Sequence, residues 1–486
     1  MCGILLYTDP TRDFTYLQQQ IAHRGPDSTQ LITHDGIAFF SSVLSLRSPF
    51  TAQPLIDEDF VLQFNGELYN DEISGNDTRW IQQMLQETGD VVPTIRSLDG
   101  EFAYVIYQRS TRTISFGRDP VGKRSLVWST AGDQLVVASV HPIEDREQYT
   151  DCLNGVIYQY NLDTHTLTMI PNDTHYNINP NTDQDITHIS ERVSQLHSVL
   201  SRSVAQRLKT IHPLHTSSTP FSILFSGGLD CTVIASLCAQ LSPADTSIDL
   251  LNVAFDNPRT GLTASEAPDR QLAIQTWLSL CKTHPTTTFN LIEIDVPYSE
   301  YQDIRPKVIE LMYPKNTEMD LSIAIAFYFA SRGRGSLLSY GDDGSTASIL
   351  RQPGYQSTGK VLFSGLGADE LYGGYHKFAN KDSTTLVPEL EKQINGIYER
   401  NLMRDDKVIS DNGVEVRYPF LSHDVIKFST EEIEINYKVN KLILRELAKT
   451  LGLGFVAEEP KRAIQFGSKS AKITQGGKIK GTDSLS

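Results

Sequence analysis

The sequence predicts an α+β domain of antiparallel sheets with few helices, followed by an α/β domain with a mainly parallel sheet. Three observations predict this division. Short apolar runs separated by turns fill residues 2–168, as in antiparallel strands. Apolar runs of strand and helix type alternate over residues 190–468, as in sheets covered by helices. Residues 169–189 between them are almost entirely polar or turn-forming, which indicates a linker.

The expected elements of the first domain follow from short runs rich in β-branched and aromatic residues. In order, the expected strands are GILLY, IAFFSSVL, FVLQF, FAYVIY, TISFG, SLVW, LVVASV and VIYQY. A helical pattern over residues 78–87 interrupts them. The predominance of strands favours an antiparallel-sheet domain.

The second domain begins with an apolar stripe of helical period over residues 193–208. The expected elements that follow are strand FSILF, helix CTVIASLCAQL, strand DLLNVAF, a helix near 267–282, strand NLIEIDV, helix LSIAIAFYFASR and strand KVLF. Residues 333–359 are rich in Gly, Ser and Asp and predict a mobile insertion. The polar residues 469–486 predict a flexible tail.

Composition and charge restrict the classes of partner. The chain has 486 residues and a formal net charge of −16, which argues against a broad nucleic-acid or anionic membrane surface. No apolar run approaches the roughly 18 residues of a membrane span, and the N-terminus lacks the pattern of a secretory signal. The five cysteines are odd in number and show no metal-ligand spacing, as in a reducing compartment. We therefore expect a cytoplasmic protein that binds neither nucleic acid nor membrane.

The chain starts Met1-Cys2-Gly3. A small second residue usually permits removal of Met1, which would leave Cys2 with a free α-amine beside its thiol. Such an amine has a pKa of about 7.7–8.0 and can act as the base for its own side chain. Taken alone, the dipeptide favours an incidental cysteine buried in a strand.

Five further motifs decide between these alternatives. They are HRGPDS at 23–28, NGELYN at 65–70, NDT at 76–78, LDGEFAYVIY at 98–107 and GRDPVGKRSL at 117–126. With the N-terminal cysteine they closely resemble the class II glutamine amidotransferase domain, an N-terminal-nucleophile fold. The resemblance implies that Cys2 attacks the side-chain amide of glutamine, that Asn65 and Gly66 form the oxyanion hole, and that Glu67 and Asp77 hold the glutamine α-amino group.

The first domain departs from the family at two positions. Val43 stands where relatives usually have the arginine that clamps the glutamine carboxylate, and valine cannot replace a guanidinium. Either Arg47 or Arg24 takes over the clamp, or glutamine binds weakly; of these alternatives we expect Arg47. Val140 stands where relatives commonly have glutamate.

FSGGLD, residues 225–230, joins an expected strand to an expected helix. Glycines let backbone N–H groups approach phosphate oxygens, and the helix start adds its positive end. A simple strand-to-helix turn could also carry two glycines, but the whole motif resembles the PP-loop of ATP pyrophosphatases. The resemblance assigns Mg²⁺ binding to Asp230 and ATP contacts to Phe225, Ser226, Gly227, Gly228 and Asp230.

Later motifs narrow the resemblance to the glutamine-dependent asparagine synthetase family. FSGLGADELYGGY at 363–375 resembles its second phosphate-side motif, which implies ATP contacts for Ser364 and Gly365 and a second Mg²⁺ ligand in Asp369. KLILR at 441–445 resembles a helix whose lysine, Lys441 here, stabilises the adenylated intermediate and departing pyrophosphate. Val253 matches a position whose backbone contacts adenine, and VEVRYPFLSHDV at 414–425 agrees with the same family.

The acceptor side differs from that of asparagine synthetases. Leu366 replaces a glutamate placed beside the acyl-adenylate, and leucine can move no proton. MDLSIAIAFYF, residues 319–329, replaces a stretch that carries an arginine. Overall the chain most resembles the asparagine synthetase domain-containing proteins, which share its GxGADE, Arg404-Asp405-Asp406 and KRAIQFGS (461–468) motifs. The Arg-Asp-Asp stretch either lines an altered acceptor pocket or forms a helix-end ion-pair cluster.

These resemblances imply an ATP- and Mg²⁺-dependent ligase. It would hydrolyse glutamine and amidate a carboxylate, aspartate or a related acid, through an acyl-adenylate, releasing AMP and pyrophosphate. In the family, ammonia passes through an internal tunnel. Two alternatives stay open: a glutaminase with a silent second half, and a catalytically impaired scaffold or sensor that binds glutamine and ATP. The sequence leaves the acceptor acid and homo-oligomerisation open.

Overall fold

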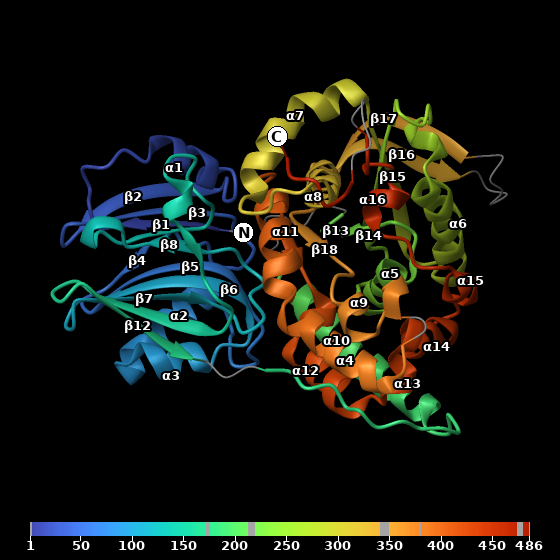
Figure 1. Ribbon diagram of the computed structural model, residues 1–486, viewed down its shortest axis with the longest axis horizontal. Coiled ribbons are helices and arrows are strands. Elements are labelled where there is room, and N and C mark those ends of the chain that lie inside the picture. The colour runs from blue at the N-terminus through green and yellow to red at the C-terminus, as the bar shows by residue number, and fades with distance from the viewer. Residues whose placement is uncertain are drawn as a thin grey trace. The chain divides into compact units, whose positions relative to one another are not determined.

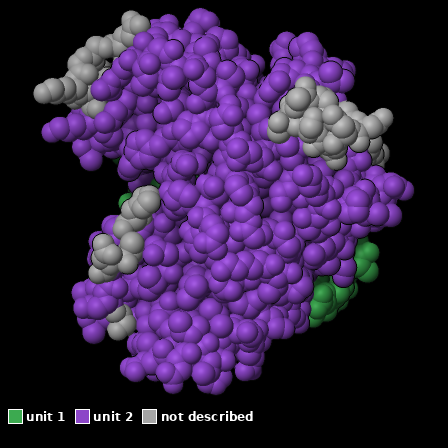
Figure 2. Space-filling model, turned by 90° about the vertical axis from the view of Figure 1, so that its right-hand side faces the viewer, with its two compact units in different colours: residues 1–175, 212–214, 398–415 green, residues 176–211, 215–397, 416–486 purple. Residues whose placement is uncertain are grey.

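The computed structural model divides the chain into two compact units, each described here by itself (Figure 1). The structure describes residues 2–171, 175–211, 219–340, 349–378, 381–473 and 480–485. Unit 1 holds the described residues up to His175 together with the segment Tyr398–Glu415. Unit 2 holds the remaining described residues, and Figure 2 shows one side of its surface.

Unit 1 contains two six-stranded sheets in which the strand pairs are antiparallel. The first, in spatial order, consists of β10 (Thr150–Asp151), β8 (Val127–Ser129), β9 (Val136–Ala138), β1 (Gly3–Tyr7), β3 (Ile37–Val43) and β2 (Ser28–His34). The second consists of β12 (Thr166–Pro171), β11 (Val156–Asn161), β7 (Thr113–Arg118), β6 (Gly100–Gln108), β5 (Phe60–Leu68) and β4 (Leu55–Ile56). The antiparallel class predicted for this part of the chain is confirmed.

Three helices cover the outer faces of these sheets, so that unit 1 is a four-layered sandwich (Figure 1). Apolar side chains from both sheets form the inner core, for example Leu6, Phe39 and Val105. Helix α1 (Thr15–Ala22) packs on the first sheet, and α2 (Asp77–Thr88) with α3 (Val91–Arg96) packs on the second. Layered packing of this kind buries one apolar face of each element.

The segment Tyr398–Glu415 belongs to unit 1 although it lies inside the range 190–468 expected for the second domain. It carries helix α11 (Met403–Ser410), after a π-helical turn, η7 (Tyr398–Leu402). Met403 packs in the core beneath α1, and the Arg118 guanidinium lies 5.2 Å from the centre of the Tyr398 ring. Residues 398–415 therefore pack in unit 1, although the residues before and after them in the sequence belong to unit 2.

Unit 2 is built on one seven-stranded sheet. In spatial order its strands are β17 (Ile349–Gln356), β16 (Arg334–Tyr340), β15 (Thr288–Val296), β14 (Ser247–Phe255), β13 (Phe221–Leu224), β18 (Val361–Phe363) and β19 (Glu415–Arg417). The four strands β15, β14, β13 and β18 pair in parallel, whereas β16 and β17 add an antiparallel hairpin. The predicted mainly parallel α/β class is confirmed.

Helices of both long and short types surround this sheet (Figure 1). The longer ones are α4 (Ile189–Lys209), α5 (Leu229–Leu241), α6 (Pro268–Thr283), α7 (Tyr298–Met312), α8 (Glu318–Ser331) and α10 (Ser383–Asn395). The shorter ones are α9 (Ala368–Leu371), α12 (His423–Lys427), α13 (Ile435–Lys438), α14 (Leu442–Thr450), α15 (Gly454–Glu458) and α16 (Ile464–Gly467). Within the described ranges, no helix combines the length and apolarity that crossing a bilayer requires.

Two sequence expectations differ from the structure. The mobile insertion expected at 333–359 contains the paired strands β16 and β17, and the Arg351–Glu293 ion pair at 2.8 Å links β17 to β15. Residues 341–348 lie outside the described residues. The described part of the expected tail is docked: Glu318 N–H donates to Asp483 O at 3.0 Å and Leu485 N–H to Asn316 O at 2.7 Å. Main-chain hydrogen bonds to partners distant in sequence explain why composition alone misjudged both segments.

The expected linker also has a partner. Unit 2 begins at Tyr176, whose N–H donates to the Asn395 side-chain oxygen at 2.9 Å, and the Ile178 N–H donates to Glu391 at 3.0 Å. Tyr176 and Ile178 have no regular secondary structure, but hydrogen bonds from their backbone to side chains of α10 hold them in place.

Candidate active sites

Cys2 lies in unit 1, directly before β1, with its main chain held from two sides. Its N–H donates to the Asn65 side-chain oxygen at 2.9 Å, and its carbonyl accepts from Arg24 Nε at 3.2 Å. The side-chain amide of Gln53 lies 3.8 Å from the sulfur. Burial raises the pKa of the Cys2 thiol to about 11, and the carboxylates of Glu415 and Asp77 add to that rise. The thiol is therefore protonated at neutral pH, and any nucleophilic role needs a base.

Asn65 and Gly66 lie on β5 beside this cysteine. The Asn65 Nδ2 group is buried and has no hydrogen-bond partner among the described residues. Its amide thus holds the Cys2 nitrogen with its oxygen and keeps a spare donor. At Gly66 a Cβ would stand 2.2 Å from the Glu101 carbonyl on the paired strand β6, so no side chain fits there. An unsatisfied donor beside a thiol is the chemistry that a developing oxyanion needs.

Arg47, Glu67 and Asp77, predicted to bind glutamine, form one ionic group. Arg47 Nε donates to Glu67 and lies 3.8 Å from Asp77 Oδ2. The rest of the guanidinium donates to two main-chain carbonyls, those of Gly75 at 3.0 Å and Leu68. Burial raises the pKa of Asp77, and the Arg47 charge opposes that rise. A zwitterion such as an amino acid could replace these contacts with its own carboxylate and ammonium groups.

Arg24, the other arginine considered for the glutamine carboxylate, is differently engaged. It is only 1 % exposed, and its Nη2 donates to Asp406 Oδ2 at 2.9 Å while its Nε holds the Cys2 carbonyl. Arg24 is thus tied to Asp406 and to the Cys2 main chain, while its Nη1 has no hydrogen-bond partner within the described part of the chain. Val43, at the end of β3, is buried, and so is Val140.

The Arg-Asp-Asp stretch, whose role the sequence left open, divides into two parts on α11. Arg404 and Asp405 pair with each other, the Asp405 oxygen lying 2.9 Å from Nε and 2.8 Å from Nη2. Asp406 instead accepts hydrogen bonds in unit 1 from Arg24 and from the N–H and hydroxyl of Ser125. Sequence reasoning missed this connection because nothing local links position 406 to position 24.

In unit 2 the glycine-rich turn 225–228 connects β13 to α5. Gly227 has a φ of 77°, and a Cβ there would stand 2.6 Å from the Ala273 nitrogen on α6. The left-handed conformation and the close approach of α6 both require glycine. Gly228 N–H donates to the Ser226 hydroxyl at 3.3 Å, which fixes the turn at the start of the helix. Phe225 and Val253 are buried, so only their main chains could reach a nucleotide.

The second motif, residues 363–375, begins in β18 and packs against the start of α5, which follows this turn. A Cβ at Gly365 would stand 2.9 Å from Asp230 Cβ, so the glycine allows the two motifs to touch. Ser364 N–H donates to the Arg417 carbonyl at 3.0 Å, and its hydroxyl accepts from Leu366 N–H at 3.2 Å. Leu366, partly exposed, thus presents an apolar side chain at the position where a carboxylate is expected.

Two aspartates and two lysines form a charge cluster in unit 2. Lys441 Nζ lies 2.6 Å from Asp230 Oδ2 and 2.6 Å from Asp369 Oδ1, and Lys461 Nζ donates to Asp369 Oδ2. Burial acts against ionisation of Asp369, but the two ammonium groups outweigh it and hold the pKa of this carboxyl well below its usual range. Gly374 makes room for the cluster, because a Cβ there would overlap Asp369 and Lys441.

Lys461 is the member of this cluster that sequence reasoning did not assign. Its position within the KRAIQFGS motif, which the sequence shares with the family it resembles, was the available signal. Burial lowers the pKa of Lys461, but the opposing charges of Asp369 and Asp230 raise it overall. The ammonium group is therefore charged, as a phosphate ligand must be.

Asp230 and Asp369 fit a magnesium ion that carries part of its coordination on phosphate and water, because hard cations prefer carboxylate oxygens. Among the described residues, no group of three or more His, Cys, Asp or Glu side chains forms an all-protein metal site. Two carboxylates would suffice for an ion bound together with a nucleotide.

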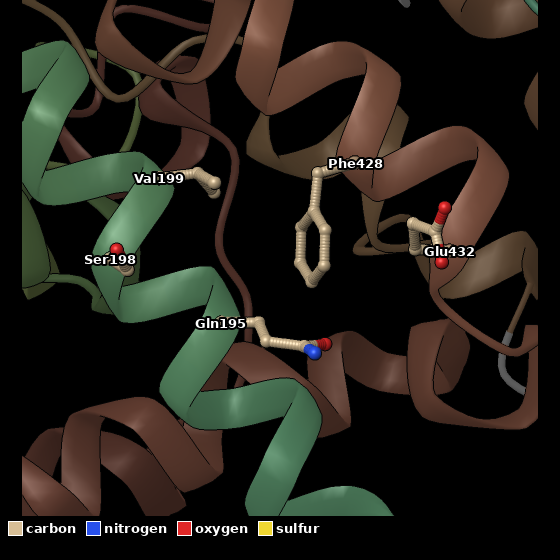
Figure 3. Close-up of a pocket in the computed structure, with 5 residues that line it drawn as sticks. All are labelled: Gln195, Ser198, Val199, Phe428 and Glu432. Carbon is tan, nitrogen blue, oxygen red and sulfur yellow. The ribbon is translucent and has the colours of Figure 1, made fainter.

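A separate cavity of about 300 Å³ opens between α4 and the π-helical turn η9 (Phe428–Glu432). Figure 3 shows Phe428 reaching into the gap between the two helices, opposite Gln195 and Val199. Ser198 and Glu432 complete its lining. The cavity shares no residue with the charge cluster or with the glycine-rich turn, and its lining holds a single carboxylate.

Two family models match parts of the chain. Residues 1–143 match a family model described as a glutamine amidotransferase domain, and residues 388–478 match one described as asparagine synthase. Asparagine synthetase domain-containing protein YML096W of Saccharomyces cerevisiae is 52% identical over 497 residues, covering 98% of this chain and 92% of that protein.

More distant relatives extend the similarity over almost the whole chain. Asparagine synthetase domain-containing protein CG17486 of Drosophila melanogaster is 28% identical. The match covers 98% of this chain and 99% of that protein. An asparagine synthetase [glutamine-hydrolyzing] of Lotus japonicus is 25% identical over 91% of this chain and 71% of its own. The chain belongs to the family of asparagine synthetase domain-containing proteins.

Proposed function

We propose that this protein hydrolyses glutamine at Cys2 and uses the ammonia, with ATP, to amidate a carboxylic acid, either aspartate or a related acid. The observation that carries the proposal is the charge cluster of Asp230, Asp369, Lys441 and Lys461. Two carboxylates and two ammonium groups, beside a glycine-rich turn at a helix start, suit a magnesium nucleotide. The match to the asparagine synthase model implies ATP use as well.

In the first half-reaction, the Cys2 sulfur attacks the amide carbon of glutamine after Met1 has been removed. The α-amine takes the thiol proton and later gives it to the leaving ammonia. The spare Asn65 donor, with the Gly66 N–H, stabilises the oxyanion. Water then hydrolyses the thioester to glutamate. Glu67 and Asp77 hold the glutamine ammonium group, while Arg47 exchanges its present carboxylate partner for the carboxylate of the substrate.

In the second half-reaction, a carboxylate oxygen of the acceptor attacks the α-phosphorus of ATP and pyrophosphate leaves. Ammonia then attacks the acyl-adenylate carbon, and AMP departs with the electrons of the broken C–O bond. Ser226, Gly227, Gly228, Ser364 and Gly365 are the residues proposed to bind the phosphates. Lys441 and Lys461 neutralise the pyrophosphate charge. Magnesium, held by Asp230 and Asp369, would neutralise phosphate charge when bound.

The acceptor pocket differs from that of an asparagine synthetase in two respects that favour a different acid. Leu366 replaces a carboxylate with an apolar group, and helix α8, which carries the sequence MDLSIAIAFYF, has no arginine in that stretch. An acceptor that depends on a guanidinium clamp would therefore lose its main contact. We infer that the acceptor carries fewer charges than aspartate or binds through other groups.

The decisive test is identification of the products. The full-length protein is incubated with ATP, Mg²⁺, glutamine and one acid at a time, from aspartate to aliphatic acids, while glutamate, AMP and pyrophosphate are measured. AMP that appears only with one acid identifies the acceptor. A Cys2→Ala variant is expected to lose glutamate formation but to retain AMP formation when ammonia is supplied. Glu72→Gln, a substitution at an exposed position of unit 1, serves as the control.

Two other outcomes would replace this proposal. Glutamate without AMP for every acid tested would leave a glutaminase whose second half is silent. Binding of ATP and glutamine, measured by calorimetry, without any turnover would indicate a catalytically impaired scaffold or sensor. Val43, Val140 and Leu366 are the substitutions that favour this last alternative.

A further inference from the structure

The carboxylate of Asp406 accepts three hydrogen bonds on one of its oxygens. Its Oδ2 atom accepts from Arg24 Nη2 at 2.9 Å, from the Ser125 N–H at 3.0 Å and from the Ser125 hydroxyl at 2.7 Å. Its Oδ1 atom lies 3.8 Å from Arg124 Nη1. The side chains of Asp406, Arg24 and Arg124 are at most 1 % exposed. Separating the Asp406 carboxylate from the Arg24 guanidinium would leave buried charges without a partner, which is costly.

Arg24 connects Asp406 to Cys2, because it donates hydrogen bonds to both residues. A guanidinium is planar and rigid, so holding Nη2 on Asp406 also orients Nε, which donates to the Cys2 carbonyl at 3.2 Å. On the other side, the Cys2 nitrogen is held by Asn65. The chain Asp406–Arg24–Cys2 thus fixes the main chain of the residue whose amine and thiol must face each other.

Charge supports the same chain of contacts. Burial raises the pKa of Asp406, but the Arg24 and Arg124 charges outweigh it, so the carboxyl is ionised in the folded protein. Arg124 has a second partner in Glu101, at 3.2 Å from its Nη2. Arg24 has only Asp406 as its carboxylate partner in the described contacts. Loss of Asp406 would therefore leave Arg24 as a buried, uncompensated charge.

We propose that Asp406, on the C-terminal segment Tyr398–Glu415, is a positioning residue for glutamine hydrolysis that aligns Cys2 through Arg24. Cys2 and Arg24 lie near the N-terminus, whereas Asp406, which holds Arg24, lies on a helix nearly 400 positions later in the chain. The inference rests on the proposed function, because it assigns Asp406 to the same cysteine. It goes beyond that function by naming a residue outside the region that matches the amidotransferase model, residues 1–143.

Asp405 provides a matched control on the same helix. It is buried, carries the same charge and is adjacent in sequence, but it pairs with its neighbour Arg404 rather than with Arg24. Asp406→Asn and Asp405→Asn therefore remove equivalent buried carboxylates. Only the first disturbs the contact chain that ends on Cys2.

The test compares glutamine hydrolysis by the full-length D406N, D405N, R24Q and R24Q/D406N proteins. D406N is expected to lower kcat by ~10- to 100-fold, because displacing a reacting group by about 1 Å costs about that much, while KM changes less than twofold. D405N is expected to keep kcat. If Asp406 acts through Arg24, the double variant falls no further than the worse single variant. Equal losses in D405N and D406N, or losses that multiply in the double variant, would overturn the proposal.

A second substitution keeps the test valid if D406N does not fold. Ser125→Ala removes the hydroxyl that lies 2.7 Å from both Asp406 Oδ2 and the Ser139 carbonyl, and it leaves every charge in place. It is expected to lower kcat by ~3- to 10-fold, with KM unchanged, because the Asp406 carboxylate loses part of its alignment. A folded S125A protein with wild-type kcat contradicts the proposal.

Alkylation of Cys2 separates this inference from the proposed function. Iodoacetamide labelling, located by peptide mass spectrometry, needs no turnover. Because Cys2 is only 8 % exposed, loosening its main chain should speed labelling about fivefold or more in D406N, but less than twofold in D405N. If the wild-type chain hydrolyses no glutamine, the proposed function fails, while this difference still decides the positioning role. Equal labelling rates in both variants would refute it.

Discussion

Asp230 and Asp369, which belong to two separate motifs, are bonded to the same ammonium group. Lys441 Nζ lies 2.6 Å from an oxygen of each. Without this lysine the two carboxylates would repel each other at close range. Lys441 therefore holds both side chains where one cation can bridge them, and a magnesium nucleotide could take over that bridging role.

The first prediction concerns the pH dependence of stability. Lys441 and Lys461 lower the pKa of Asp369. A carboxyl with a lowered pKa in the folded state contributes stability above its unfolded pKa, 3.8, and loses it as the pH falls further. Asp369→Asn should thus cost about 2 kcal/mol of unfolding free energy at pH 7, between the values for exposed and buried pairs. The cost should shrink as the pH drops from about 5 towards 3.

Urea denaturation at several pH values, without nucleotide, measures this difference. Asp303→Asn, at an exposed position of α7, is the control, because it removes a carboxylate outside the charge cluster. A D369N cost that is constant from pH 7 to pH 3 would show that the ion pairs contribute nothing.

The second prediction separates the two cluster lysines from other lysines. Lys441→Met and Lys461→Met should each lower the rate of AMP formation by ~100-fold, the usual scale for losing one electrostatic group at a reacting centre. Lys449→Met should not, because Lys449 pairs with Glu446 on the surface of α14. Rates are measured with saturating ATP, ammonia and the identified acid. Retention of full activity in K461M would remove Lys461 from the site.

The third prediction uses the free amine at Cys2. An uncleavable N-terminal extension should lower glutamine hydrolysis at least ~100-fold, because the base is converted into an amide. Ammonia-dependent AMP formation should persist in the same protein. Mass spectrometry establishes the N-terminal residue, and the protein without an extension is the control. Full glutaminase activity with Met1 retained would contradict this mechanism.

The fourth prediction concerns the pH dependence of the rate. Burial raises the pKa of the Cys2 thiol to about 11, so the thiol itself does not titrate near neutral pH. The activity, kcat/KM for glutamine, should therefore rise with pH through the pKa of the α-amine, about 7.7–8.0, as the amine becomes an available base. Initial rates of glutamate formation from pH 6 to 9 measure it. A rise centred near pH 5 would instead indicate a carboxylate base.

Apolar periodicity and residue type along the chain predicted many of the helices and strands correctly. The helical stripe over 193–208 corresponds to α4, and the apolar run FSILF to β13 followed by a tight glycine turn. The strands and helices expected between residues 221 and 331 form, because period and β-branched content depend on neighbours along the chain. The same reasoning placed candidate residues beside one another where one motif contains them, as with Asn65, Gly66 and Glu67 on β5.

By itself, the sequence determined the two fold classes, the two motifs that end parallel strands and the family, because these depend on residues close together in the chain. Only the tertiary structure decided which distant charges meet. It joined Asp406 to Arg24, Lys461 to Asp369, and the residues after 480 to the start of α8. The physical reason is that a buried charge is stable only with a partner in space, and no periodicity along the chain records which partner that is.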